Sequence, residues 1–316
     1  MTSEVTVLGA GVIGLSCATV LAESGARVRI VTADPSEATT SAAATGMAGP
    51  VIPGGDERAQ RWELATVAHL RALAGSAGVR MATGLVAAPA GTGAPPLVDD
   101  SLVRTARPDE LPAGFAFGMW LTVPLVDVPV YLGHLLARFT AAGGEIEPHR
   151  VTELEAAGDA PVLVNCSGLG ARELCGDTDV HPVKGQQVVL ANPGLDGFFM
   201  PAPGPAEWAS WHAHGDHVLL GGVRHAHDAD PAPSPATAAG ILERCAALEP
   251  RLAGARVLGH RAGLRPERSR VRLETEQRGA LRVVHCYGHG GTGVLQSWGC
   301  ALDVAALVGS ADRVSR

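Results

Sequence analysis

Aromatic side chains and positive charge are scarce in this chain of 316 residues. Aromatic residues make up 4% of the sequence and include two tyrosines, and 25 Lys and Arg against 32 Asp and Glu give a net charge of −7. This balance offers no basic surface for a nucleic acid. Hydrophobic residues still make up 46% of the chain, which is enough for a large core. We therefore expect a globular protein with no nucleic-acid partner.

Cysteine pairs with the spacing of redox or zinc motifs are also missing. The six cysteines are scattered, and most of them have apolar neighbours, which predicts free buried thiols in a reducing compartment. The uncharged run at residues 5–22 follows Glu4 rather than a basic start and is interrupted by glycines, unlike a secretory signal. We expect a cytoplasmic protein that has no membrane partner.

A glycine cluster near residue 10 has the spacing of a dinucleotide-binding turn, Gly9-Ala10-Gly11-Val12-Ile13-Gly14. A β-branched run at 5–8 precedes the cluster, and a helical composition at 15–23 follows it. A second expected strand at 26–31 leads to Asp34, 20 residues after Gly14. Glycines let the backbone approach a pyrophosphate at a helix N-terminus, and an acid at this distance can bond a ribose hydroxyl. The combination predicts a dinucleotide site.

A second glycine cluster, Tyr287-Gly288-His289-Gly290-Gly291-Thr292-Gly293, lies far along the chain. Between the two clusters, strand-like runs at 79–128 and 185–220 alternate with helical patterns at 62–74, 131–142 and 236–248. A hairpin is expected at 270–286 and a helix at 300–308. This order predicts that the chain returns to one ligand after building a second region, so that both regions are discontinuous in sequence.

Eight short segments occur in the order seen in one known family. They are residues 7–16, 38–41, 164–174, 182–186, 263–266, 271–274, 287–291 and 297–301. On these motifs, which cover essentially the whole chain, the sequence resembles the D-amino-acid oxidases. The resemblance implies an α/β (α+β) fold, in which a Rossmann-like FAD-binding domain is interleaved with an antiparallel-sheet substrate domain. We expect the FAD-binding domain at residues 1–53, 140–188 and 256–316, and the substrate domain at 54–139 and 189–255.

The resemblance also implies which residues hold the FAD. The first glycine cluster would lie at the pyrophosphate. The second would border the isoalloxazine ring, where its N–H groups would stabilise the developing negative charge. The expected cofactor-binding residues are Gly9, Ala10, Gly11, Val12, Ile13, Gly14, Asp34, Thr39, Thr40, Ser41, Thr45, Gly46, Met47, Val151, Ser167, Gly168, Gly288, Gly290, Gly291, Thr292, Gly293, Val294 and Leu295.

Two positions match the family's contacts with substrate. Arg265 matches the arginine that holds the substrate carboxylate, a role that suits a planar guanidinium fork. The backbone carbonyl of Gly291 matches the acceptor of the substrate ammonium. The resemblance then implies hydride transfer from the substrate Cα to flavin N5, hydrolysis of the imine, and reoxidation of the flavin by O₂ to give H₂O₂. Taken alone, Arg265 also fits the solvent face of a strand that continues with Arg268, Arg270 and Arg272.

The segment before residue 217 departs from the family pattern. The family has tyrosines there, whereas this chain reads Trp208-Ala209-Ser210-Trp211-His212. Ser210 would take the place of the tyrosine nearest the carboxylate, with Trp208 and Trp211 flanking it, and Trp211 and His212 would belong to the site. The missing phenol removes a hydrogen bond worth about 1.5–3 kcal/mol. We predict weak activity on small D-amino acids and a preference for a bulkier or atypical amino-acid-like amine, for which a biosynthetic role would fit.

The histidines in and near this segment allow other interpretations. Residues 212–217 match the HxHxDH run of zinc hydrolases of the metallo-β-lactamase type, and neutral imidazoles are good zinc ligands. The preceding residues 205–208 are not the long apolar strand which that fold requires. We therefore expect no metal, and histidines that line the pocket or are solvated. His289 is expected to support the flavin rather than to act as a base.

Two other functions remain open. An NAD-dependent dehydrogenase needs only the first glycine cluster, and flavin absorbance would exclude it. A non-catalytic flavoprotein of the same fold would explain the missing tyrosines, and flavin reduction by an amine would argue against it. A homodimer is also left open.

Overall fold

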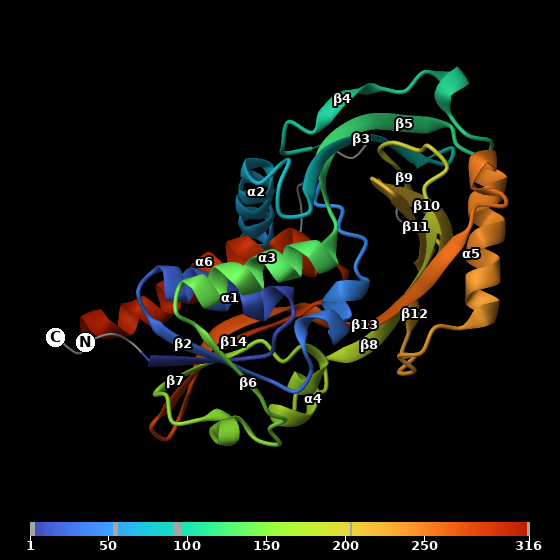
Figure 1. Ribbon diagram of the computed structural model, residues 1–316. Helices are drawn as coiled ribbons and strands as arrows, with labels where there is room; N and C mark the ends of the chain where they lie inside the picture. Colours follow the sequence, from blue (N-terminus) through green and yellow to red (C-terminus); the bar gives the residue numbers. More distant parts are fainter. Residues whose placement is uncertain (1–3, 53–55, 92–96, 203, 315–316) are drawn as a thin grey trace.

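The computed structural model describes residues 4–52, 56–91, 97–202 and 204–314. These residues form a 14-stranded sheet with the order β4-β5-β3-β9-β10-β11-β8-β13-β14-β7-β1-β2-β6, and a short strand β12 (His225–Ala226) pairs with β8. Helices pack on both halves of the sheet (Figure 1). The mixed α/β fold expected from the sequence is confirmed.

One half of the sheet is parallel. It contains β1 (Glu4–Leu8), β2 (Arg27–Thr32), β6 (Glu145–Pro148), β7 (Val162–Asn165) and β14 (Leu281–His289). Each neighbouring pair in the order β14-β7-β1-β2-β6 runs parallel. The central strands are runs of buried Val, Leu and Ile, as expected where helices or loops cover both faces. The carboxyl ends of these strands therefore meet at one edge.

Four helices cover one face of the parallel half. Helix α1 (Val12–Glu23) begins directly after Gly11, and α3 (Val128–Ala141) and α6 (Gly293–Val314) pack against it (Figure 1). Helix α2 (Glu57–Ala72) packs against α6 and begins at Asp56, whose carboxylate accepts a hydrogen bond from the Arg58 N–H at 2.9 Å. The shared core holds large side chains such as Trp62, Tyr131 and Phe139. The expected helices at 62–74 and 131–142 correspond to α2 and α3.

The other half of the sheet is mainly antiparallel. It contains β3 (Val79–Ala88), β4 (Leu102–Thr105), β5 (Phe117–Val126), β8 (His181–Ala191), β9 (Phe198–Pro201), β10 (Glu207–His214), β11 (His217–Val223) and β13 (Val257–Arg278). Helix α5 (Pro235–Leu248) covers its outer face (Figure 1). Alternate residues of β8, β10 and β11 pack under α5, among them Leu190, Ala213 and Leu220. The opposite face of these strands is left to line a cavity.

Strand β13 joins the two halves. Residues 257–267 pair with β8, and residues 272–278 pair with β14. The sheet is therefore continuous. Helices α2 and α3 lie in the segment 54–139 assigned to the substrate domain, yet they pack against α6 and α1 of the parallel half. The domain boundaries drawn from the sequence stay a prediction.

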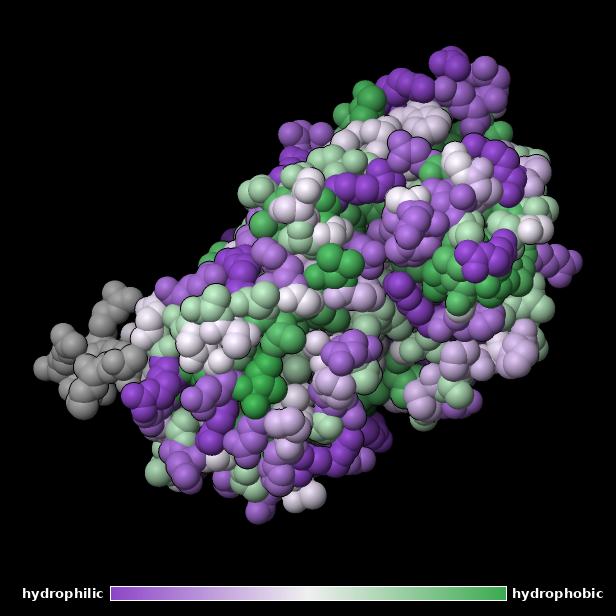
Figure 2. All heavy atoms as spheres, viewed as in Figure 1, coloured by the Kyte–Doolittle hydropathy of each residue, from purple (hydrophilic) through white to green (hydrophobic). Residues whose placement is uncertain are grey.

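The surface is mixed in polarity. Figure 2 shows hydrophilic and hydrophobic side chains interspersed over both halves of the visible face. Within the described ranges, no helix has the length and apolar character needed to cross a membrane.

Candidate active site

A cavity of about 970 Å³ lies where the two halves of the sheet meet. Its size is at the upper end of the range typical of ligand pockets, about 300–1,000 Å³. Its walls come from the start of α1, the segment 38–47, the ends of β7 and β14, and the inner faces of β8, β10 and β13. A short helix, α4 (Ala171–Leu174), contributes at the edge. Segments from both ends of the chain thus meet around one space.

The first glycine cluster forms a turn that only glycine permits. Gly9 has a φ of +107°, and a Cβ there would lie 2.6 Å from the carbonyl oxygen of Cys166. A Cβ on Gly14 would overlap the carbonyl oxygen of Gly9. The N–H of Val12 donates to Ser41 Oγ at 3.0 Å. Gly14 supports the turn from behind and does not line the cavity, whereas the preceding five residues do.

The far end of the cavity lies at the carboxyl ends of β2 and β6. Asp34 and Val151 both line it, as does Arg150, whose guanidinium lies 3.6 Å from the Asp34 carboxylate. The sequence predicted Asp34 from its distance to the glycine cluster. Arg150 had no motif to indicate it, because only the parallel pairing of β2 and β6 brings it to Asp34.

A buried polar network supports the turn after β7. The Asn165 Oδ1 accepts hydrogen bonds from the Ser167 N–H at 3.2 Å and from the Ser167 hydroxyl at 2.7 Å. The Asn165 Nδ2 lies 3.3 Å from His285 Nδ1, and His285 Nε2 lies 3.0 Å from the Glu276 carboxylate. Ser167 and Gly168 line the cavity. The sequence pattern indicated this turn but not the side chains that hold it.

The second glycine cluster forms the start of α6. Residues 290–292 make one 3₁₀ turn that leads directly into the helix, and the Thr292 hydroxyl donates to the His289 carbonyl at 2.8 Å. The N-termini of α1 and α6 therefore meet at one cavity, and each presents the positive end of a helix dipole. All the residues predicted from 288–295 line the cavity.

His289 is buried in this turn. Burial lowers its pKa to about 4, so the imidazole is neutral at physiological pH. Its Nε2 has no hydrogen-bond partner in the part of the chain that the structure describes. A supporting role beside the cofactor therefore stays the prediction for His289.

Arg265 lies on β13 with its guanidinium over Gly185 of β8. A Cβ on Gly185 would lie 2.6 Å from Arg265 Cζ, so that glycine makes room for the guanidinium. Its Nη1 donates to the carbonyl of Val223 at 3.2 Å and weakly to that of Lys184 at 3.4 Å. Nε and Nη2 make no hydrogen bond to any described residue, and the side chain lines the cavity. This leaves two parallel donors for a carboxylate.

The structure also brings Gly291 to Arg265. A Cβ on Gly291 would lie 3.7 Å from Arg265 Cδ. Burial, and then the charge of Arg224, lower the pKa of Arg265 from its ordinary value, but an arginine remains charged at neutral pH. A half-buried cation thus lies against the residue whose carbonyl was predicted to accept the substrate ammonium.

The inner face of β10 carries Trp208, Ser210 and His212, which all line the cavity. Trp211 points to the other face and packs in the core under α5, because successive residues of a strand alternate between faces. This corrects the expectation that Trp211 stands beside the substrate. Trp208, the other residue expected to flank Ser210, does line the cavity, and its ring lies against Gly222, where a Cβ would lie 2.7 Å from Trp208 Cζ2.

The run 212–217 forms the β10–β11 hairpin. His212 stacks on Phe198 at 6.0 Å between ring centroids, and burial lowers its pKa to about 3. Burial also lowers the pKa of His214 to about 4. His217 Nδ1 lies 2.9 Å from the Asp216 carboxylate. The rings of His214 and His217 stack at 5.5 Å between centroids, but the three histidines do not form one of the groups of described residues whose metal-ligating atoms all lie within 4.8 Å of one another.

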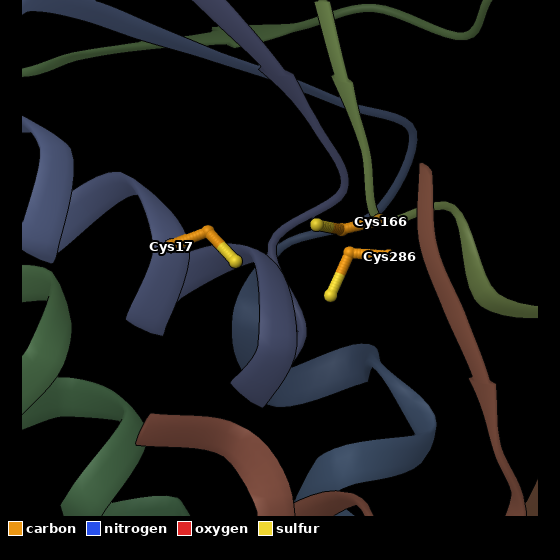
Figure 3. A group of neighbouring side chains, drawn as sticks. All are labelled: Cys17, Cys166 and Cys286. Atoms are coloured by element: carbon orange, nitrogen blue, oxygen red, sulfur yellow. The ribbon is translucent and has the colours of Figure 1, made fainter. Parts of the chain in front are cut away.

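In the described part of the chain, two other groups of side chains bring metal-ligating atoms within 4.8 Å of one another. They are Cys17, Cys166 and Cys286, and Cys286, His289 and Cys300. Figure 3 shows the first three sulfurs facing one another between α1 and the ends of β7 and β14. Hydrogen bonds with the thiols of Cys17 and Cys286, and then burial, raise the pKa of Cys166 well above its ordinary value. Cys17, Cys286 and Cys300 are fully buried in the core, and Cys166 packs against it.

Comparison with known proteins agrees with this geometry. The family described as FAD dependent oxidoreductase matches residues 4–307. The chain is 44% identical to a D-amino-acid oxidase of Rubrobacter xylanophilus, over 98% of this chain and 97% of the relative. It is 35% identical to the human D-aspartate oxidase, over 97% of this chain and 95% of the relative. A glycine oxidase structure from Geobacillus kaustophilus superposes with a TM-score of 0.81 at 22% identity, over 98% of this chain and 95% of the other. This superposition shows a shared fold.

The residues around the cavity fit an FAD. Glycines without room for a Cβ, the N-terminus of α1 and the hydroxyl of Ser41 lie together at one part of the cavity, and the N-terminus of α6 lies at another. Of the cofactor-binding residues expected from the sequence, all except Gly14 line this one cavity.

Proposed function

Since this chain belongs to the FAD-dependent oxidoreductase family that includes the D-amino-acid oxidases, we propose that it catalyses the oxidative deamination of a D-amino acid or a related amine. The amine would be oxidised to an imine that hydrolyses to the oxo acid and ammonia. O₂ would accept the electrons and give H₂O₂. The observation that carries the proposal is a half-buried arginine that lies against Gly291 and has two donors without a partner among the described residues.

The chain's own residues would bind and orient the substrate. Nε and Nη2 of Arg265 would hold the two carboxylate oxygens, and the Gly291 carbonyl would accept a hydrogen bond from the amine. Two contacts of this kind fix the plane of the amino acid and hence the direction of its Cα–H bond. Bound FAD would supply the hydride acceptor.

The cofactor would be held mainly by backbone groups. The N–H groups at the starts of α1 and α6 would contact the pyrophosphate and the flavin ring, respectively. Asp34 and Val151, at the far end of the cavity, would contact the ribose and the adenine. The roles of the individual residues are part of the proposal.

The substrate would be larger than D-alanine. Ser210 and Gly221 stand side by side on the wall, and a Cβ on Gly221 would lie 3.4 Å from Ser210 Oγ. Two small residues at this point leave room for a side chain, and the family's tyrosine hydroxyl is absent there. A biosynthetic role would suit a bulky substrate, and six free thiols fit a reducing cytoplasm.

An acidic amino acid is the second candidate substrate. Arg224 lines the cavity and one relative is a D-aspartate oxidase. However, Arg224 is paired with Glu267, which also lines the cavity. Because this carboxylate compensates the arginine, we place the acidic substrate second.

A visible spectrum followed by a substrate screen tests the proposal. We expect bound flavin absorbance in the purified protein, bleaching under anaerobic conditions by D-amino acids, and peroxide release in air. The screen should hold amino acids of both hands, D-alanine, D-proline and D-aspartate among them. A protein without flavin would support the NAD-dependent alternative, and failure of all amines would support a non-catalytic flavoprotein. Efficient oxidation of D-alanine or D-proline would contradict the size preference.

A further inference from the structure

Several buried polar atoms on the substrate wall have no partner. They are Trp208 Nε1, both ring nitrogens of His212 and the Gln187 Oε1, none of which is hydrogen-bonded within the described residues. All three residues line the cavity. Gln187 is fixed at its other end, since its Nε2 donates to the Thr45 hydroxyl. We call Trp208, His212 and Gln187 the polar wall.

The strand register places the polar wall on one surface. Ser210 pairs with Gly221, and a Cβ on Gly221 would lie 3.9 Å from Gln187 Cγ. Trp208 and His212 are the residues two before and two after Ser210, so all three share the face that lines the cavity. The polar wall therefore surrounds the small residues where we place the substrate side chain.

His212 is the most enclosed member. Its side chain is 2% exposed and lies flat against Phe198. A neutral imidazole offers one N–H donor and one acceptor nitrogen. Buried polar groups in native proteins are almost always paired, so a partner that neither donates nor accepts would leave both nitrogens of His212 unsatisfied.

The hydrogen-bonding groups of the polar wall determine which substrate side chains it can bind. It offers donors at Trp208 and His212 and acceptors at His212 and Gln187. A carboxamide or a hydroxyl can satisfy both kinds of group, whereas an aliphatic side chain satisfies neither and a carboxylate can only accept. No charged side chain belongs to the polar wall, so an ion would gain no counter-charge from it.

We propose that the polar wall selects amino acids with a neutral hydrogen-bonding side chain, above all a carboxamide, and that His212 is the main specificity-determining residue. This inference rests on the proposed oxidation of D-amino acids. It adds the class of side chain, which the resemblance does not supply.

Pairs of substrates with matched shape test the inference. D-asparagine and D-leucine are similar in size and branching, and D-glutamine and D-methionine are similar in size and length. Each pair therefore differs mainly in hydrogen bonding. We expect kcat/KM for the amide to exceed that for its aliphatic partner by about tenfold or more, since one good hydrogen bond is worth roughly that factor and an unpaired site rejects more strongly. D-aspartate is the charged member of the series and should react more slowly than D-asparagine.

Three variants assign the effect to His212. His212→Leu removes both hydrogen-bonding atoms and should bring the D-asparagine to D-leucine ratio to about one, mainly through the loss of activity on the amide. His212→Gln keeps a donor and an acceptor and should retain part of the preference. His69→Leu is the matched control, because His69 also has a buried ring nitrogen without a partner among the described residues but does not line the cavity. It should leave the ratio unchanged.

Several results would overturn the inference. They are equal kcat/KM for amide and aliphatic substrates in the wild type, a faster reaction with D-aspartate, or an unchanged ratio in His212→Leu. If His212 had only a structural role, its substitution would lower kcat/KM equally for both substrates and leave their ratio unchanged. If His212→Leu does not fold, the wild-type ratio and His212→Gln decide. Failure of every D-amino acid to reduce the flavin would instead refute the proposed function, and this inference with it.

Discussion

The two ends of the cavity are built in different ways. The dinucleotide end consists of turns after parallel strands, where backbone N–H groups and residues without large side chains face the ligand. The substrate end consists of side chains that project from antiparallel strands, such as Arg265, Trp208 and His212. A site made of backbone depends on the absence of side chains, so few residue types are tolerated. A site made of side chains can change its ligand without changing the fold.

The largest effect should come from a side chain placed in the first glycine turn. Gly14→Val would drive a Cβ into the Gly9 carbonyl. We expect the free energy of unfolding to fall by about 3 kcal/mol or more and FAD binding to be lost. The measurement is flavin per protein together with the Tm. Gly133→Ala in α3 is the control, because nothing lies within 4 Å of a Cβ there. A Gly14→Val protein that retains FAD would show that the dinucleotide end tolerates side chains after all.

At the substrate end, the largest effect should come from the carboxylate anchor. Arg265→Leu removes two charged hydrogen bonds, so we expect kcat/KM for amino acids to fall by roughly 10²–10⁴-fold with FAD still bound. Arg270→Leu is the control on the same strand, since Arg270 is exposed and does not line this cavity. Steady-state kinetics measure the effect. An unchanged KM in Arg265→Leu would remove Arg265 from this role.

Acid should destabilise the protein through two buried histidines that line the cavity, His212 and His289. Burial lowers the pKa of His212 to about 3 and that of His289 to about 4, from an unfolded value near 6.5. Below pH 6.5 the unfolded chain binds protons that the folded chain does not, so stability falls as the pH decreases from about 6.5 to 4. Each histidine should contribute on the order of 3 kcal/mol.

Thermal unfolding between pH 7.5 and pH 4.5 checks this prediction. The pH dependence should be shallower in His212→Leu than in the wild type. Gly133→Ala, which leaves every histidine in place and adds a Cβ with nothing within 4 Å, should have the wild-type slope. A slope that His212→Leu leaves unaltered would mean that other groups cause the acid sensitivity.

The smallest effect should separate the two faces of β10. Trp211→Phe changes the core under α5, and we expect a loss of about 1 kcal/mol of stability with substrate KM unchanged. Trp208→Phe changes the wall of the cavity and should alter kcat/KM a few-fold while affecting stability less. Denaturant unfolding and kinetics on both variants make the comparison. If Trp211→Phe alters KM as much as Trp208→Phe does, the two faces are not independent.

Local patterns predicted much of the fold. The first strand, turn and helix appear at residues 4–23, because apolar runs, glycine spacing and helix composition all depend on near neighbours in sequence. The helices that were expected at 62–74 and 236–248 occupy 57–72 and 235–248. Periodicity could not show how α2 and α3 would pack, since their apolar faces fit either half of the sheet.

Trp211 is a residue whose orientation could not be predicted from the sequence. The segment 208–212 was identified as the place where the substrate wall departs from its family, and the structure brings Trp208, Ser210 and His212 to the cavity. Which of its residues face inward depends on the register of β10 with β9 and β11. A shift of one residue would reverse the whole set.

The sequence by itself determined the cofactor class and the order of the elements, because glycine spacing and strand–turn–helix patterns are local and are tied to backbone geometry. Only the tertiary structure decided that both glycine clusters border one cavity, that Gly185 makes room for Arg265, and that Trp208 rather than Trp211 faces the cavity. Those facts depend on the pairing of strands that are distant in the chain, and the pairing is set by burial of the whole sheet rather than by any local pattern.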